Sequence, residues 1–153
     1  MHFPDEYDKR ILRLLQRNNK LTAEEMGEEL SLSQSAVQRR IAKLRSEKII
    51  EADISIISPK AAGVGITCVV DVVLIEGTSK SIDKFKTAMQ QCAEVAQCYY
   101  VTGTYDFVLI VNLKDMQHFE EFSKAQLMDN PNLKHFYTHV VMDKVKVKYG
   151  IDI

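Results

Sequence analysis

Near the N-terminus, apolar residues recur every three or four positions in three short segments, which is the spacing of one face of an α-helix. The first segment follows Asp5 and the third follows Ser33, and both residues can cap a helix. Between them, Thr22 and Glu25 form a capping box, which marks another helix start. The sequence therefore predicts three helices, with inward-facing residues that include Tyr7, Ile11, Leu14, Leu15, Val37, Ile41 and Leu44.

The turn between the second and third predicted helices is short. Only four residues, Leu30 to Ser33, separate them, so the two helices have to cross. Gly27 has no side chain and permits a close approach at the crossing. Two helices joined in this way form a helix-turn-helix, whose second helix lies in the major groove of DNA. The pattern therefore predicts DNA binding by the third helix.

The outward face of the third helix carries the chemistry of recognition. Its first residues have donors and acceptors that match base edges, glutamine with adenine and arginine with guanine. The basic residues that follow can neutralise phosphates. The alternative is a solvated helix whose basic residues complement the helix dipole, but the capping box, short turn and polar leading edge together favour DNA binding. The predicted DNA-binding residues are Ser33, Gln34, Ser35, Gln38, Arg39, Arg40, Lys43 and Arg45.

After the third helix, the apolar spacing changes to strict alternation, which is typical of a half-buried strand. The alternation runs from Ile50 to Ile56, and Pro59 follows it. We interpret this stretch as a linking strand between two domains. The predicted boundaries are 1–50 for a three-helix, winged-helix-like DNA-binding domain, 51–65 for the linking strand and linker, and 66–153 for a second domain.

The second domain is predicted to follow the order β-α-β-β-α-β, the split βαβ arrangement of ferredoxin-like folds. Ser79 or Ser81 begins its first helix, and Asp115 begins the second, which Pro131 stops. The resulting α+β protein has helices on one face of a sheet and leaves the other face open. A second copy of the chain is the simplest cover for that face. The predicted strands are Ile66–Ile75, Val95–Thr102, Phe107–Leu113 and Phe136–Met142, with a final strand over Val145–Tyr149.

Composition excludes several classes of protein. The net charge of −1 does not argue against DNA binding, because the basic residues are concentrated on one helix. No apolar run reaches the 18 or so residues of a membrane span, and the start of the chain lacks a signal peptide's apolar core, so we expect a cytoplasmic protein. The three cysteines are expected to be reduced structural thiols. His135 and His139 would lie about 13 Å apart along a strand, so no metal site is predicted.

Several segments together resemble the Lrp/AsnC (feast/famine) family of transcriptional regulators over nearly the whole chain. They are the Asp5–Asp8 segment with Ile11 and Leu12, LSQSAVQRRIAKL at Leu32–Leu44, Pro59 with Gly63, and VTGTYDF at Val101–Phe107. The resemblance implies a linking strand that pairs with its symmetry mate, and a dimer that assembles further, often to an octamer. It also implies a C-terminal domain that binds small amino acids between subunits.

Four positions depart from the family pattern. Ser31 and Lys48 stand where the family usually has glycine, and a residue other than glycine at positive φ costs about 1 kcal/mol. Pro4 replaces a usual leucine. Thr104 replaces a more usual acidic residue in the hairpin, which affects the polar contacts expected for a ligand.

A free amino acid needs an acceptor for its ammonium group and donors for its carboxylate. Asp106 can supply the acceptor, and backbone amides at Gly103 can supply the donors. The alternative is that Gly103 only provides a positive φ and Asp106 only caps its own turn. The resemblance favours an effector site formed by Tyr100, Val101, Gly103, Thr104, Tyr105, Asp106 and Met116, together with Thr138, His139 and Val140 from a neighbouring subunit.

This predicted lining is mostly apolar and has no lysine or arginine for a second carboxylate. An aliphatic effector such as leucine or methionine is therefore favoured, and no other cofactor is expected. Two alternative functions are an architectural protein that packages DNA without an effector, and a metabolite-binding protein or enzyme. The enzyme is disfavoured because no paired carboxylates, nucleophile with a base, or phosphate-binding loop is recognisable.

Overall fold

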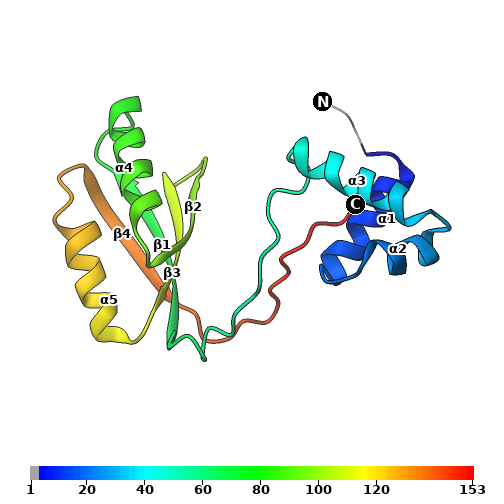
Figure 1. Ribbon diagram of the computed structural model, residues 1–153. Helices are drawn as coiled ribbons and strands as arrows, with labels where there is room; N and C mark the ends of the chain where they lie inside the picture. The colour runs from blue at the N-terminus through cyan, green and yellow to red at the C-terminus, as the bar shows by residue number, and fades with distance from the viewer. Residues whose placement is uncertain (1–3) are drawn as a thin grey trace. The chain divides into compact units, whose positions relative to one another are not determined.

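The computed structural model describes residues 4–153 and divides them into two units (Figure 1). One unit contains the N-terminal helices up to Ile56 and also Lys146–Ile153. The other unit is Ile57–Val145. The domain predicted at residues 66–153 therefore includes a C-terminal segment that the structure groups with the helices, and residues 1–3 of the domain predicted at 1–50 lie outside the described residues.

The helical unit contains α1 (Glu6–Arg17), α2 (Ala23–Leu30) and α3 (Gln34–Ser46). The predicted caps are confirmed, because the side chains of Asp5, Thr22 and Ser33 each accept a hydrogen bond from a backbone amide in the first turn. The core of the unit is formed by Ile11, Leu14, Met26, Leu30, Val37, Ile41 and Leu44. The prediction for Tyr7 was wrong, because this side chain is 42% exposed.

The turns that bound α2 and α3 have the backbone geometry expected of glycine positions. Ser31 caps α2 with φ 57°, and Lys48 follows α3 with φ 54°. Gly27 meets the turn closely, since a Cβ atom there would lie 2.5 Å from the carbonyl oxygen of Leu32. The close approach predicted at Gly27 is thus present, although the nearest neighbour is the turn itself.

The two strands predicted at residues 50–56 and 145–149 are not formed in the single chain. Both segments are extended, and their apolar side chains, including those of Ile54, Ile56, Val145 and Val147, are exposed. A strand needs a neighbour for its backbone hydrogen bonds, and neither segment lies in the sheet of residues 4–153. The sequence alternates as predicted, but residues 4–153 of a single copy supply no neighbouring strand for either segment.

The C-terminal segment contacts α1 of the helical unit. The Ile151 amide donates to Oε1 of Gln16 at 2.6 Å, and Nε of Arg13 donates to the carbonyl oxygen of Ile153 at 2.5 Å. The chain therefore passes between its two units twice, once after Ile56 and again after Val145.

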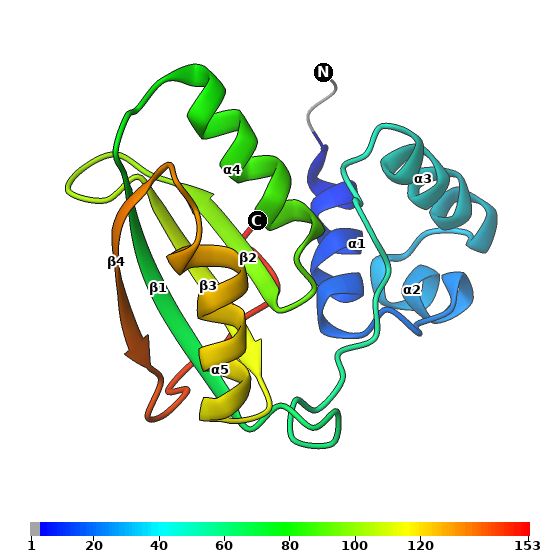
Figure 2. The ribbon, with the colours of Figure 1, turned by 90° about the vertical axis from the view of Figure 1, so that its left-hand side faces the viewer.

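The second unit is a four-stranded sheet with two helices on one face (Figure 2). The strands are in the order β2-β3-β1-β4, and all neighbours are antiparallel, so the predicted ferredoxin-like fold is confirmed. After Phe122 the second helix continues as a π-helical segment. The elements are β1 (Ile66–Leu74), α4 (Ser79–Gln91), β2 (Val95–Tyr100), β3 (Phe107–Leu113), α5 (Met116–Phe122), η1 (Ser123–Met128) and β4 (Leu133–Val140).

Alternation along the strands assigns each side chain to one face of the sheet. Cys68, Val70, Val72 and Leu74 of β1 are buried beneath the helices together with alternate residues of β3. The opposite, open face carries the intervening residues, most of which are half-buried or exposed. The open face includes Thr67, Val69, Asp71, Val73, Gln97, Tyr99, Val108, Ile110, Asn112, His135, Tyr137 and His139, of which Thr67 is buried.

Candidate nucleic-acid interface and effector site

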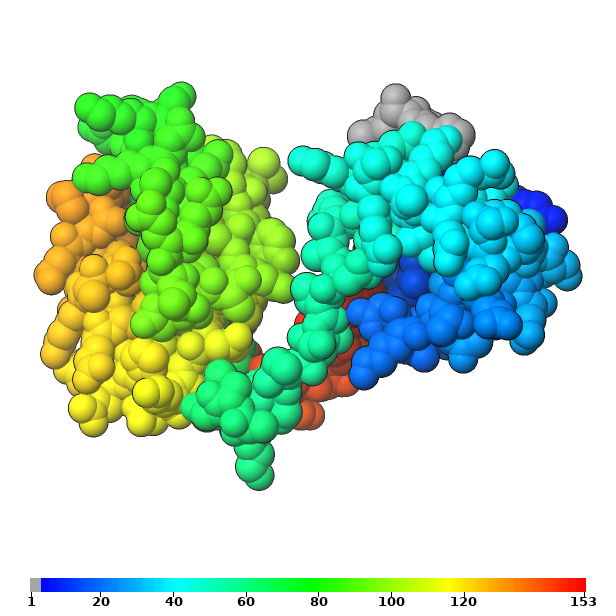
Figure 3. Space-filling view, in the orientation of Figure 1, coloured from blue at the N-terminus to red at the C-terminus, as the bar shows by residue number. Residues whose placement is uncertain are grey.

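The polar face of α3 is exposed, and its apolar face is buried. Gln34, Ser35, Gln38, Arg39 and Lys43 are exposed, opposite the core residues of the same helix. Figure 3 displays α3, in cyan, at the surface of the helical unit. The structure thus brings together the base-reading residues and one phosphate-binding lysine that the sequence predicted.

Several of the predicted DNA-binding residues already have partners in the protein, including Lys43, whose Nζ atom lies 4.0 Å from Oε1 of Glu47. Ser33 caps α3, its Oγ accepting from the Ala36 amide at 3.2 Å. Arg45 forms an ion pair with Asp53 at 3.0 Å, and both side chains are largely exposed, so the pair contributes little stability and can exchange for a phosphate. Arg40 is different, because its guanidinium lies against α1.

Arg40 joins the recognition helix to the start of α1. Its Nη1 atom donates to Asp5 Oδ2 and to Asp8 Oδ1, both at 2.7 Å, and its guanidinium carbon lies 5.5 Å from the centre of the Tyr7 ring. The Asp8 amide and the Arg40 guanidinium, which both donate hydrogen bonds to Asp5, lower the pKa of that carboxyl group. The two carboxylates in turn raise the pKa of Arg40. A cleft of about 290 Å³ beside this cluster is lined by Asp5, Asp8, Arg39, Arg40 and Lys43.

The hairpin between β2 and β3 has the geometry predicted for it. Gly103 adopts φ +121°, a conformation that favours glycine. The Val101 amide donates to the Asp106 carbonyl at 2.9 Å, which closes the loop. Asp106 also binds β1, because its Oδ2 accepts from the Leu74 amide at 2.8 Å. One carboxylate oxygen of Asp106 therefore has a structural role, because it holds the hairpin against β1.

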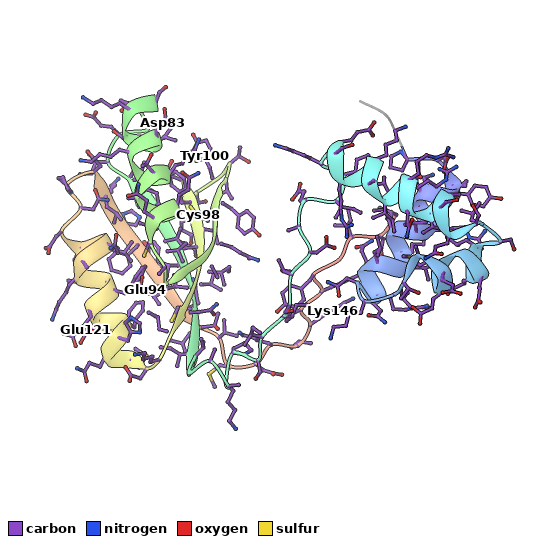
Figure 4. All side chains as sticks on the ribbon, in the orientation of Figure 1. Asp83, Glu94, Cys98, Tyr100, Glu121 and Lys146 are labelled. Atoms are coloured by element: carbon purple, nitrogen blue, oxygen red, sulfur yellow. The ribbon has the colours of Figure 1, made fainter. Side chains whose placement is uncertain are left out.

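Tyr100 has a neighbour that the sequence did not indicate. Its ring packs against Phe107 at 5.1 Å, and Lys86 of α4 places its ammonium 4.9 Å from the ring centre. Lys86 comes from an earlier helix, so no local pattern could have placed it here. In Figure 4, Tyr100 and Cys98 lie on the strand that runs beside α4.

The predicted effector residues fall into two groups at opposite ends of the sheet. Tyr100 to Asp106 form the hairpin before β3, whereas Met116 comes after β3. The strand β3 is about 20 Å long, so it separates the two groups by about that distance. Met116 was predicted to line the same effector site as the hairpin, but within one copy of the chain its side chain is 55% exposed and lies at the other end of β3. At the end of the sheet near Met116, Val140 pairs with Cys68, which itself pairs with Val111.

The three predicted residues of β4 do not share a face. Thr138 and Val140 lie on the helix side, and the Oγ1 atom of Thr138 is buried without a hydrogen-bond partner in the described chain. His139 lies on the open face, where its Nε2 is 3.1 Å from Oδ2 of Asp71. Alternation along the strand separates them, so a single cavity cannot be lined by all three side chains of one β4.

A second cleft, of about 170 Å³, lies beside α5 and contains none of the predicted effector residues. It is lined by Glu94, His118, Glu121, Phe122, Ala125 and Gln126. Figure 4 labels Glu94 and Glu121. Hydrogen bonds from the Cys92 thiol and from His118 lower the pKa of Glu94. No group of three or more His, Cys, Asp or Glu side chains in residues 4–153 could hold a metal ion, and no helix there could span a membrane.

A helix-turn-helix unit followed by a ferredoxin-like unit defines a class of DNA-binding proteins that carry a regulatory domain. Residues 5–45 match the AsnC-type helix-turn-helix domain, and residues 67–151 match the Lrp/AsnC ligand binding domain. The chain belongs to the Lrp/AsnC family. It is a DNA-binding transcriptional regulator with a ligand-binding domain, and it is not an enzyme.

Relatives match over nearly the whole chain. An uncharacterised HTH-type transcriptional regulator, y4tD, of Sinorhizobium fredii is 44% identical over 97% of this chain and 88% of its own length. The leucine-responsive regulatory protein of Escherichia coli is 25% identical over 93% of this chain and 87% of its own. A Neisseria meningitidis transcriptional regulator solved as a complex with L-methionine superposes with a TM-score of 0.91, at 25% identity, over 98% of this chain and 97% of that one.

Proposed function

We propose that this regulator binds DNA as a homo-oligomer and that its DNA binding responds to a small aliphatic amino acid held between subunits. Leucine and methionine are the favoured effectors. The hairpin around Gly103 is the observation that carries the proposal. Support also comes from two relatives, one described as leucine-responsive and one solved with L-methionine.

The hairpin can hold both ends of an amino acid. Gly103 is in a backbone conformation that lets neighbouring amides converge on a carboxylate. Asp106 is held by its bond to the Leu74 amide, so its remaining oxygen is in a fixed position to accept from an ammonium group. Lys86 places its ammonium 4.9 Å from the centre of the Tyr100 ring, which adds a positive charge close to Tyr100.

A second copy of the chain would complete this site. The hairpin residues and the group around Met116 and Val140 lie about 20 Å apart in one copy. If both groups contact the same effector, they have to come from different subunits. The effector would then favour the assembly that gives it the better pocket, and DNA affinity would change through the same linkage. A coupling of about 1 to 3 kcal/mol changes DNA occupancy severalfold to a hundredfold.

Calorimetric titration of the purified protein with each of the twenty amino acids tests the proposal. We expect binding heat for leucine or methionine at millimolar concentration or below, and a changed affinity for duplex DNA in its presence. Heat for none of the twenty would favour a DNA-packaging protein without an effector and would refute the proposed regulation.

Asp106→Asn tests the role of the hairpin carboxylate. The amide oxygen still accepts from Leu74, but the negative charge that meets the ammonium group is removed. We expect effector affinity to fall by about tenfold or more, the loss of one charge-assisted hydrogen bond, with DNA binding in the absence of effector unchanged. Asp129→Asn, the same substitution on an exposed residue after η1, is the matched control. An unchanged response in the Asp106 variant would move the site elsewhere.

A further inference from the structure

The capping box of α1 is formed by Asp5 and Asp8. Each of these two carboxylates also has a second oxygen, which accepts a hydrogen bond from Arg40 of the recognition helix α3. The Asp5 amide donates to Asp8 Oδ2 at 3.2 Å, and the Asp8 amide donates to Asp5 Oδ1 at 2.8 Å. Each carboxylate therefore uses one oxygen inside the box. The other oxygen of each, Asp5 Oδ2 and Asp8 Oδ1, accepts from Nη1 of Arg40. We call these three side chains the α1–α3 clasp.

Burial distinguishes Arg40 from the other basic residues of α3. Its side chain is 27% exposed, and that of Asp8 is 6% exposed, whereas the side chains of Lys43 and Arg45 are at least half exposed. Removing Arg40 from its site would leave the buried Asp8 carboxylate without its counter-charge. A phosphate would have to compete with two carboxylates that are already in place at 2.7 Å.

We propose that Arg40 is a positioning residue, which holds the recognition helix against the start of α1 and does not contact DNA phosphates. Its neighbours on the exposed face, Arg39 and Lys43, make the contacts with DNA. The clasp sets the direction of α3 relative to the rest of the helical unit, and hence which bases Gln34, Gln38 and Arg39 can reach. This role differs from the one that the sequence predicted for Arg40.

The dependence of DNA affinity on salt separates the two roles. A residue that neutralises a phosphate adds about 0.9 to the slope of log affinity against log salt, whatever the DNA sequence. A positioning residue leaves that slope unchanged and affects only the preference for the right sequence. The probes are a duplex that the native protein selects from a random-sequence pool and the same duplex with its bases shuffled.

The experiment measures binding of both probes by full-length variants at several salt concentrations, at a temperature where unfolding is negligible. For Arg40→Gln we expect the preference for the selected duplex to fall by about tenfold, comparable to one mismatched base pair, with an unchanged salt slope. Arg40→Lys should restore most of the preference, because one ammonium group can donate to both carboxylates, as Nη1 does. The matched control, Lys43→Gln, should weaken both duplexes alike and flatten the slope by about 0.9.

Two results would overturn the proposal. A slope flattened by Arg40→Gln as much as by Lys43→Gln would make Arg40 a phosphate contact, and an unchanged preference would mean that the clasp does not position α3. If Arg40→Gln does not fold, Asp5→Asn replaces it, since Asp5 is the more exposed carboxylate of the clasp. The same loss of preference at an unchanged slope is then expected.

Discussion

Ser31 and Lys48 show how single residues store strain in the helical unit. Both have φ near +55°, a conformation in which a Cβ atom crowds the backbone. Both stand at positions where the Lrp/AsnC family usually has glycine. Each turn is nevertheless closed by backbone hydrogen bonds, such as the one from the Leu32 amide to the Gly27 carbonyl at 2.9 Å. The surrounding helices therefore impose the conformation, and the two residues tolerate it at a cost.

Ser31→Gly should relieve this cost. Glycine adopts positive φ without a Cβ clash, so we expect the free energy of unfolding to rise by up to about 1 kcal/mol. Ala42→Gly is the control, because Ala42 is an exposed residue in the interior of α3, where glycine should lower stability by about 0.5 to 1 kcal/mol. Denaturant unfolding of both variants checks the expectation. A loss of stability in the Ser31 variant would show that the serine side chain contributes more than the backbone strain costs.

At the level of elements, the sequence predicted what local patterns determine and missed what partners determine. The caps at Asp5, Thr22 and Ser33 and the positive φ at Gly103 depend on residues a few positions apart. The strands predicted around Ile54 and Val147 depend on a neighbouring strand, and the described part of the chain does not supply one.

The same reasoning explains the misplaced side chains. Arg40 meets carboxylates 32 and 35 positions away, and Lys86 meets a tyrosine on another element. No local spacing encodes such contacts. Met116 was included in the effector site because of the resemblance to the family, and the intervening strand β3 carries it to the end of the sheet opposite the hairpin.

Gly27 determines how closely the turn of the helix-turn-helix can approach α2. An added Cβ would lie 2.5 Å from the backbone oxygen of Leu32, which cannot move without distorting the turn before α3. We expect Gly27→Ala to lower the free energy of unfolding by about 1 to 3 kcal/mol, as overpacking does. At the control position, Gly77, a Cβ would meet nothing within 4 Å, so Gly77→Ala should be neutral or slightly stabilising. Equal effects at the two positions would contradict the close approach.

At the scale of the whole molecule, recognition depends on where charge and apolar surface are placed. The net charge is −1, yet α3 and its C-terminal end carry Arg39, Lys43 and Arg45, so attraction to DNA is local. The open face of the sheet and the exposed linking segment offer apolar surface that one copy does not bury. A dimer would bury this surface and also present two recognition helices to two half-sites of DNA.

Ile110→Glu tests whether the open face joins two copies. Ile110 lies near the middle of that face, between Val69 of β1 and Gln97 of β2, so a carboxylate there would be buried without a partner in a dimer. We expect light scattering to report a smaller assembly, and affinity for the selected duplex to fall by about a hundredfold as the second recognition helix is lost. Lys80→Glu on the exposed surface of α4 is the control, since it changes the charge even more without touching the open face. If the Ile110 variant keeps the native assembly, another surface holds the copies together, and the exposed linking segment with Ile54 and Ile56 becomes the next surface to test.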